Sequence, residues 1–149
     1  MSARMNVVLS AGLAGGTLEV PYERSLPLTG SQVNLDVTMS PPRALSVNGE
    51  PAVGNRVDVT TTPTLSWSAP VRGTTNRYSV TIYDLADKTF KKSFFTTRTT
   101  LDVPPFTLVA GKTYAFVVVA ERGAYDLLRP TYTPAETERI GACSDSFTP

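Results

Sequence analysis

The segment AGKT at residues 110–113 is the first feature that could do chemistry, because it matches the end of a phosphate-binding loop. Such a loop also needs a glycine five residues before its last glycine, and a helix after the Lys-Thr pair. The earlier position is Phe106, which follows two prolines that donate no N–H. Residues 114–120 are a β-branched and aromatic run that predicts a strand. We therefore expect no nucleotide site here.

Catalysis is judged from two features of the sequence, the carboxylates and the absence of histidine. The chain has no histidine, which excludes Ser-His-Asp and Cys-His mechanisms. Two carboxylate pairs could still exchange protons, Asp84 with Asp87 and Glu136 with Glu138. Both pairs stand in predicted turns or loops beside polar residues, so we expect them to be solvated. We predict that the protein is not an enzyme.

The sequence offers few of the side chains that usually bind a metal or cofactor. Cys143 is the only cysteine, so no disulfide can form within the chain, and it is expected to be a small, half-buried strand residue. One cysteine without histidine cannot build the usual zinc shell. Calcium binding by loop carboxylates stays open, although no calcium motif is present. We expect no cofactor and no metal.

A long irregular segment at residues 121–139 contains the residue types that dominate binding hot spots, namely Arg122, Tyr125, Arg129 and Tyr132. Connections of this length are usually functional or mobile. Two interpretations stay open, a partner-binding loop and a solvated insertion.

Length and composition indicate a folded protein. The 149 residues are 41% hydrophobic and 18% charged, enough for one domain plus an extension. A net charge of +1 argues against nucleic-acid binding. Four basic residues do gather at Lys88, Lys91, Lys92 and Arg98, where we expect a solvated strand face and turn. No run of 18 apolar residues exists, so we expect no membrane span.

Short alternating segments predict an all-β fold. Residues 1–40 hold three candidate strands, and Pro21 places the second of them at a sheet edge. Two prolines at 41–42 mark a boundary, so we expect an N-terminal β-strand extension, or the remnant of a preceding β domain, at 1–40 and a domain at 41–149. Within the domain, Asn48-Gly49 predicts a hairpin turn, and the last strand is expected within 139–149 with Phe147 pointing inward.

Three spaced sets of apolar and aromatic residues stand between residues 42 and 148. The first is Pro63, Leu65 and Trp67, and the second is Tyr78, Val80 and Ile82. The third and most diagnostic set is Leu108, Ala110, Gly111, Lys112, Tyr114, Phe116, Val118 and Ala120. With these sets, residues 42–148 resemble a fibronectin type III domain, in which the first set lies on the second strand and the second set on the third strand. The chain departs from the family pattern in three places: Pro63 is one residue closer to Leu65, Ala110 stands where the family usually has proline, and Lys112 where it has threonine.

The resemblance implies an immunoglobulin-like seven-stranded β-sandwich. Trp67, Tyr78 and Leu108 would then belong to its core, with Trp67 as the large central residue. Gly111 would take a positive φ at the turn into the sixth strand, and Tyr114 would be a tyrosine-corner residue whose hydroxyl bonds the upstream backbone. Some family members bind integrins through Arg-Gly-Asp, but this chain has Arg-Gly-Ala at 122–124, so that activity is not carried over.

The functional expectation is a non-catalytic module. We expect an extracellular or cell-surface domain, bacterial in character, that is anchored through a larger secreted or surface protein and serves in protein–protein binding, adhesion or spacing. The alternative is a self-assembling structural subunit that pairs its N-terminal strands with a neighbouring chain. Carbohydrate binding stays open without sequence support.

The outward positions of the sixth strand bear on that choice. Ala115, Val117 and Val119 are apolar where an exposed sheet face normally carries polar residues. We therefore count Val117 and Val119 among the candidate partner-binding residues. The N-terminal strands are expected to cover this face as the remnant of a preceding sandwich, or to add to a neighbouring chain.

Replacing Tyr125 and Tyr132 by alanine tests the loop. If the loop binds a partner, the melting temperature should stay nearly unchanged while binding weakens. Trp67→Ala is the contrasting variant, because removing a core tryptophan should cost about 3–5 kcal/mol. Thermal unfolding of both variants checks this, and a large loss of stability in the tyrosine variant would show that the loop belongs to the core.

Overall fold

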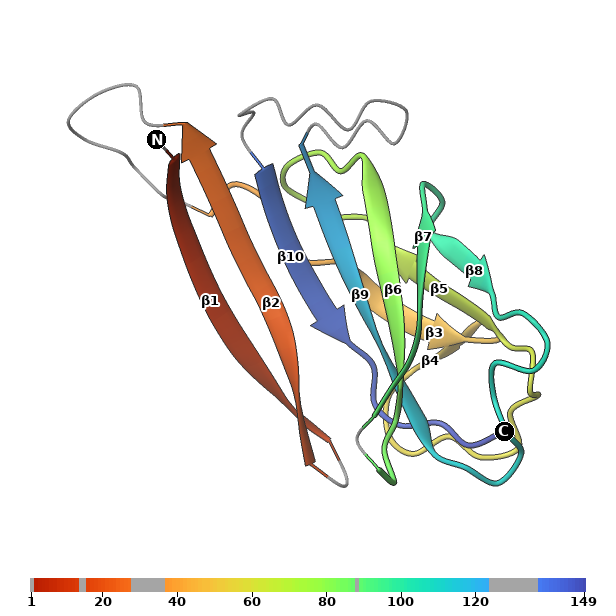
Figure 1. Cartoon of the computed structure of the whole chain (residues 1–149). Helices are drawn as coiled ribbons and strands as arrows, with labels where there is room; N and C mark the ends of the chain where they lie inside the picture. Colours follow the sequence, from red (N-terminus) through yellow and green to blue (C-terminus); the bar gives the residue numbers. More distant parts are fainter. Residues whose placement is uncertain (1, 14–15, 28–36, 88, 124–136) are drawn as a thin grey trace.

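The chain folds into β-structure alone. The computed structural model describes residues 2–13, 16–27, 37–87, 89–123 and 137–149. The elements of regular secondary structure in these ranges are all β-strands. These ranges contain no helix of the length and apolarity that crossing a membrane requires. The strands form two antiparallel sheets that face each other across a shared core (Figure 1). The all-β sandwich prediction is thus confirmed.

The two sheets differ in size. The smaller sheet has the order β4-β3-β5-β8, and it consists of β3 (Arg43–Val47), β4 (Glu50–Pro51), β5 (Thr64–Ser68) and β8 (Thr100–Asp102). The larger sheet has the order β1-β2-β10-β9-β6-β7, and it consists of β1 (Ser2–Leu13), β2 (Gly16–Pro27), β6 (Arg77–Asp84), β7 (Thr89–Thr96), β9 (Tyr114–Arg122) and β10 (Thr137–Cys143). All neighbouring strands are antiparallel.

Alternate residues of β5, β6 and β9 fill the space between the sheets, as period-2 patterns dictate. Trp67 is 5% exposed, and its ring meets that of Tyr78 edge to face with centroids 5.3 Å apart. Leu108 and Phe147 are also buried. Phe147 lies after β10 and reaches the core through bridges to Arg56 and Tyr114, so inward burial was predicted correctly but not its place outside the strand.

Two turns have the backbone that their residues predict. Asn48 and Gly49 have φ values of 52° and 81° and connect β3 to β4, as expected for an Asn-Gly hairpin. Gly111 has a φ of 78° just before β9. There the backbone N–H of Val109 donates to the Tyr114 hydroxyl at 3.0 Å, while the N–H of Gly111 donates to the carbonyl of Pro149 at 2.7 Å. The AGKT segment is thus part of a turn that leads into a strand.

The N-terminal strands continue the larger sheet of the same chain. β1 and β2 form a hairpin, and residues 22–25 of β2 pair with residues 137–140 of β10. In Figure 1 the hairpin extends this sheet away from the smaller one. The structure thus has strand addition, but to the chain's own β10. Most of the third predicted strand lies outside the described residues.

The prediction that Pro21 makes its strand an edge is wrong, because β2 lies between β1 and β10. The pairing shows why proline is tolerated there. The β10 register ends at Tyr22, so Pro21 lies just beyond the paired stretch and has a partner strand on one side only, at Val8.

The outward apolar residues of β9 are buried. Ala115, Val117 and Val119 are at most 5% exposed, although they are not part of the cluster between the sheets. The neighbouring positions on β6 and β10 flank them closely, since Thr81 and Cys143 both pair with Val117. Val117 and Val119 are therefore not available as a surface for a partner.

Gly111→Val should destabilise the protein through the backbone alone. A Cβ at this position would meet no atom within 4 Å, so the cost comes from the positive φ, which costs an ordinary residue about 1–2 kcal/mol. Asparagine tolerates this conformation and is the matched control. Urea unfolding should rank the variants Gly, Asn, Val in falling stability, and equal stability of Val and Gly would contradict the role of the positive φ.

Candidate functional site

Lys112, which stands where a phosphate-binding loop has its lysine, forms an ion pair with another residue of the chain. Lys112 Nζ lies 2.8 Å from the carboxylate of Asp84, and this hydrogen bond with its charge raises the pKa of Lys112. Asp84 is fully buried and also accepts from the N–H of Ala86 at 3.1 Å. The prediction that Asp84 is solvated is therefore wrong, because it ends β6 in register with the buried Tyr114. Asp87 is exposed, as predicted.

Glu138 is the second carboxylate that was wrongly expected to be solvated. It is 0% exposed and lies on β10 between Arg122 of β9 and Arg24 of β2. One carboxylate oxygen accepts from the N–H groups of Thr38 and Met39, both at 3.0 Å, and from the Tyr22 hydroxyl at 3.3 Å. The other accepts from the Thr38 hydroxyl at 2.5 Å. Glu136, the other member of this predicted carboxylate pair, lies outside the described residues.

Arg122 completes the surroundings of Glu138. Its guanidinium lies 3.1 Å from the Glu138 carboxylate and donates to the Thr38 hydroxyl at 2.9 Å. Burial by itself would raise the pKa of Glu138, but the bonds from Thr38 and Met39 and the charge of Arg122 outweigh it, so the pKa is lowered. Burial and the Glu138 charge raise the pKa of Tyr22, which keeps its hydroxyl a donor.

A row of alternating charges crosses the opposite face of the same sheet. The cross-strand register places Arg77, Glu121, Arg139 and Glu23 side by side on β6, β9, β10 and β2. Glu121 is 2% exposed, and its carboxylate bonds Arg77 at 2.5 Å and Arg139 at 3.0 Å. Arg139 also lies 3.7 Å from Glu23. The row neutralises a carboxylate that would otherwise be buried without a partner.

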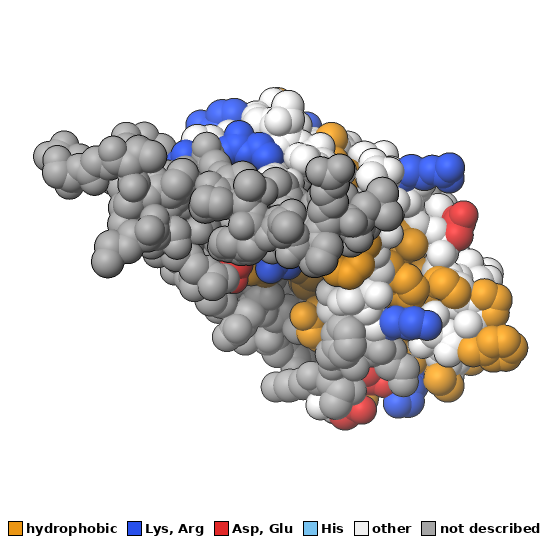
Figure 2. Space-filling model, turned by 45° about the horizontal axis from the view of Figure 1, so that its top comes forward, with side chains coloured by type: hydrophobic (Ala, Val, Ile, Leu, Met, Phe, Trp, Pro, Cys, Tyr) orange, Lys and Arg blue, Asp and Glu red, His pale blue; other side chains and the backbone are white. Residues whose placement is uncertain are grey.

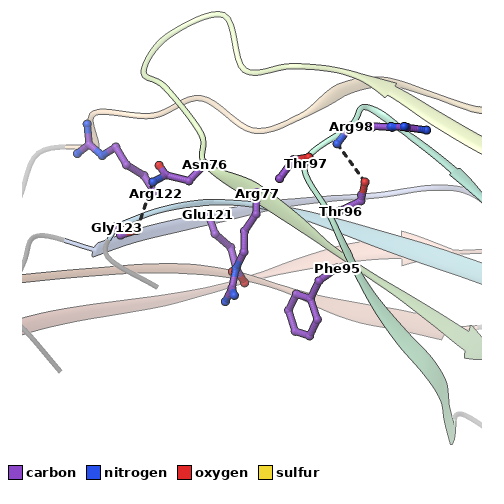
Figure 3. A pocket seen from close by; sticks show the side chains of 9 residues that line it. All are labelled: Asn76, Arg77, Phe95, Thr96, Thr97, Arg98, Glu121, Arg122 and Gly123. Carbon is purple, nitrogen blue, oxygen red and sulfur yellow. Dashed lines mark hydrogen bonds and ion pairs between the residues drawn. The ribbon is translucent and has the colours of Figure 1, made fainter. Parts of the chain in front are cut away.

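A hollow beside this row is the best candidate for a binding site. It has a volume of about 430 Å³ where β6 begins and β7 and β9 end, and it is lined by Asn76, Arg77, Phe95, Thr96, Thr97, Arg98, Glu121, Arg122 and Gly123. Figure 3 shows Arg77, Glu121 and Phe95 projecting to the same side, with Arg98 and Arg122 at opposite ends. Seen from this end, the molecule has several basic side chains close together at its top, further ones on its right and lower parts, and hydrophobic ones from the centre to the right (Figure 2).

Phe95 is the aromatic part of the lining of the hollow. The side chain is 61% exposed, which is unusual for phenylalanine, and the Arg77 guanidinium lies 4.8 Å from its ring centroid. Because Glu121 also bonds Arg77, that arginine is held in place beside the ring. Arg98 is exposed and forms no ion pair with any residue that the structure describes. The hollow thus combines an aromatic surface, hydroxyl groups and an available positive charge.

The other residues predicted to bind a partner are placed differently. Arg122 lines the hollow, but its guanidinium is engaged with Glu138. Tyr125, Arg129 and Tyr132 lie outside the described residues. Sequence reasoning missed Phe95, Arg77 and Glu121. A signal was present for Glu121, since it continues the outward positions of β9 after Val117 and Val119, where a charge requires a partner.

Cys143 is half-buried at the end of β10, and its thiol donates to the Ser144 carbonyl at 3.1 Å. Burial, together with the charge of Asp145, raises the pKa of the thiol to about 11. Since the thiolate is the nucleophile, this thiol is nearly all protonated at neutral pH. Among the residues that the structure describes, no three His, Cys, Asp or Glu side chains are grouped as a metal site would need.

Comparison with protein-family models, with curated proteins and with solved structures finds no significant match to this chain. The geometry of the chain itself must therefore support any functional proposal.

Glu138→Gln should lower the free energy of unfolding by about 3 kcal/mol at pH 7, because it leaves the partly buried Arg122 without its anion. The pKa of Glu138 is lower in the folded state, so its contribution is complete above the ordinary value of 4.5 and is lost as pH falls through the lower folded value. The difference in the free energy of unfolding between the wild type and Glu138→Gln should therefore become smaller below pH 4.5.

Glu50→Gln is the control, since Glu50 is exposed and lies 3.9 Å from Arg56. This exposed pair should contribute under about 1 kcal/mol. Denaturant unfolding across the pH range measures both variants, and a Glu138→Gln effect as small as the control would contradict the importance of the buried carboxylate.

Proposed function

We propose that this chain is a non-catalytic β-sandwich module of the fibronectin type III kind that binds a protein partner. Apart from the two-residue β4, the strands from β3 to β10 number seven, three in the smaller sheet and four in the larger. The buried Trp67 and the bond from Val109 N–H to the Tyr114 hydroxyl add support for this kind of sandwich. The proposal includes a place in a larger extracellular or cell-surface protein, which rests on the sequence resemblance.

One observation carries the non-catalytic part. Four side chains with catalytic potential are engaged within the fold: Lys112 with Asp84, and Glu121 and Glu138 with arginines. The Cys143 thiol is held in its unreactive form. What faces solvent is a hollow with an exposed aromatic ring and a cation, which are features of binding surfaces.

Self-assembly is the second candidate, and the outer strand of the hairpin favours it. β1 is 12 residues long and pairs only with β2 among the described residues. A long edge strand can accept a strand from another chain. The chain would then form filaments or closed oligomers through its N-terminal strands.

Light scattering of the full chain over a wide concentration range separates the two functions. A binding module should remain a monomer, whereas a self-assembling subunit should grow with concentration. A chain that lacks residues 1–40 should be less stable and should aggregate, because β10 loses β2 and Glu138 loses Tyr22, Thr38 and Met39. If that shorter chain is monomeric, soluble and as stable as the full one, the hairpin is only a linker.

A further inference from the structure

The outer edge of β7 is an available template for another strand. β7 pairs only with β6 among the described residues, so the backbone groups on its other side have no partner strand there. The pairing with β6 shifts between Ile82 and Tyr83, which leaves Lys91 as the extra residue of a bulge. Beyond the bulge, residues 92–96 keep a regular register with β6. These five residues are long enough to receive an extended peptide.

The charge of this edge selects the kind of strand that could join it. Residues 88–98 hold four of the 14 basic residues of the chain and no acidic one. The side chains of Lys92 and Arg98 are exposed. Lysines on an edge normally prevent edge-to-edge pairing, and two copies of β7 would bring like charges together. The same lysines attract a strand that carries Asp or Glu, so an acidic partner fits where a second copy does not.

The hollow at the end of β7 adds an apolar contact. Phe95 lies on the face of β7 that borders Ser79 of β6, and its ring is held beside the Arg77 guanidinium. Lys92 and Phe94 belong to the other face, where the Lys92 ammonium lies 5.7 Å from the Phe94 ring centroid. A strand added here would present one face to Phe95 and the other to Lys92, because side chains alternate along a strand.

We propose that β7 binds an extended acidic segment of a protein partner by strand addition along residues 92–96, with an apolar side chain of that segment in the hollow beside Phe95. Backbone hydrogen bonds would supply affinity, while Lys92, Arg98 and Phe95 would supply selectivity. The proposal rests on the protein-binding function above and specifies its site and the chemistry of the partner.

A synthetic peptide of alternating glutamate and valine is the probe, and the full isotope-labelled chain is the target. Amide NMR shifts should change along residues 92–96 and around the hollow. The same peptide with lysine in place of glutamate should not bind. A third peptide with N-methyl groups on consecutive central residues keeps the charge but cannot donate backbone hydrogen bonds, so it should bind at least about tenfold more weakly.

Charge reversal on the protein is the second arm. The double variant Lys92→Glu with Arg98→Glu should weaken binding by about tenfold, since two attractive contacts become repulsive. Arg43→Glu is the matched control, because Arg43 is an exposed strand cation in the smaller sheet. It should leave binding unchanged, and thermal unfolding should show that both variants are folded.

The proposal would be overturned by no binding of the acidic peptide, by undiminished binding of the N-methylated peptide, or by equal weakening by Arg43→Glu. Shifts confined to residues outside β7 and the hollow would also overturn it. Light scattering of the same samples keeps the two proposals apart. Concentration-dependent oligomers would count against the binding-module function, whereas a monomer that binds the peptide elsewhere counts only against β7.

Discussion

The buried carboxylate of Glu138 is the constraint on which the arrangement of the larger sheet depends. A carboxylate without exposure is stable only if charges and donors surround it. Here the donors come from three separate parts of the chain: Tyr22 on β2, the Thr38–Met39 segment, and Arg122 on β9. Loss of Arg122 would leave the carboxylate without its counter-charge, and loss of β2 or of the Thr38–Met39 segment would leave it short of hydrogen-bond donors. The hairpin and the sandwich are therefore coupled through one side chain.

Two rows of charges then fix how β2 lies on β10. In the observed register Arg24 faces Glu138, and Glu23 faces Arg139. A shift by one residue in one direction would place Glu23 opposite Glu138, and in the other direction Arg24 opposite Arg139. Either shift brings like charges together and also exchanges the two faces of the strand. A pairing of only four residue pairs is thus given a unique register by electrostatics.

The sequence predicted the parts of this structure that follow from local patterns. Leu65, Trp67, Val80 and Phe116 could be placed in the core because alternation depends only on neighbouring residues. Asp84 and Glu138 were misplaced because their burial depends on Lys112 and Arg122, which are distant in sequence. The hollow was missed for the same reason, since its lining comes from three strands that only the sheet order brings together.

The two outer edges of the larger sheet are protected unequally, and this bears on both proposed functions. β7 has a bulge and two adjacent lysines, which oppose pairing with another copy of itself. β1 carries one charged residue, Arg4, in twelve, and its register with β2 is continuous. The hairpin therefore covers the edge of β10 but replaces it with a longer and less charged edge. Selective recruitment of a foreign strand suits the chemistry of β7, whereas association between like chains suits that of β1. A protein with both edges can bind a partner on one side of its sheet and extend the sheet on the other, because four strands separate them.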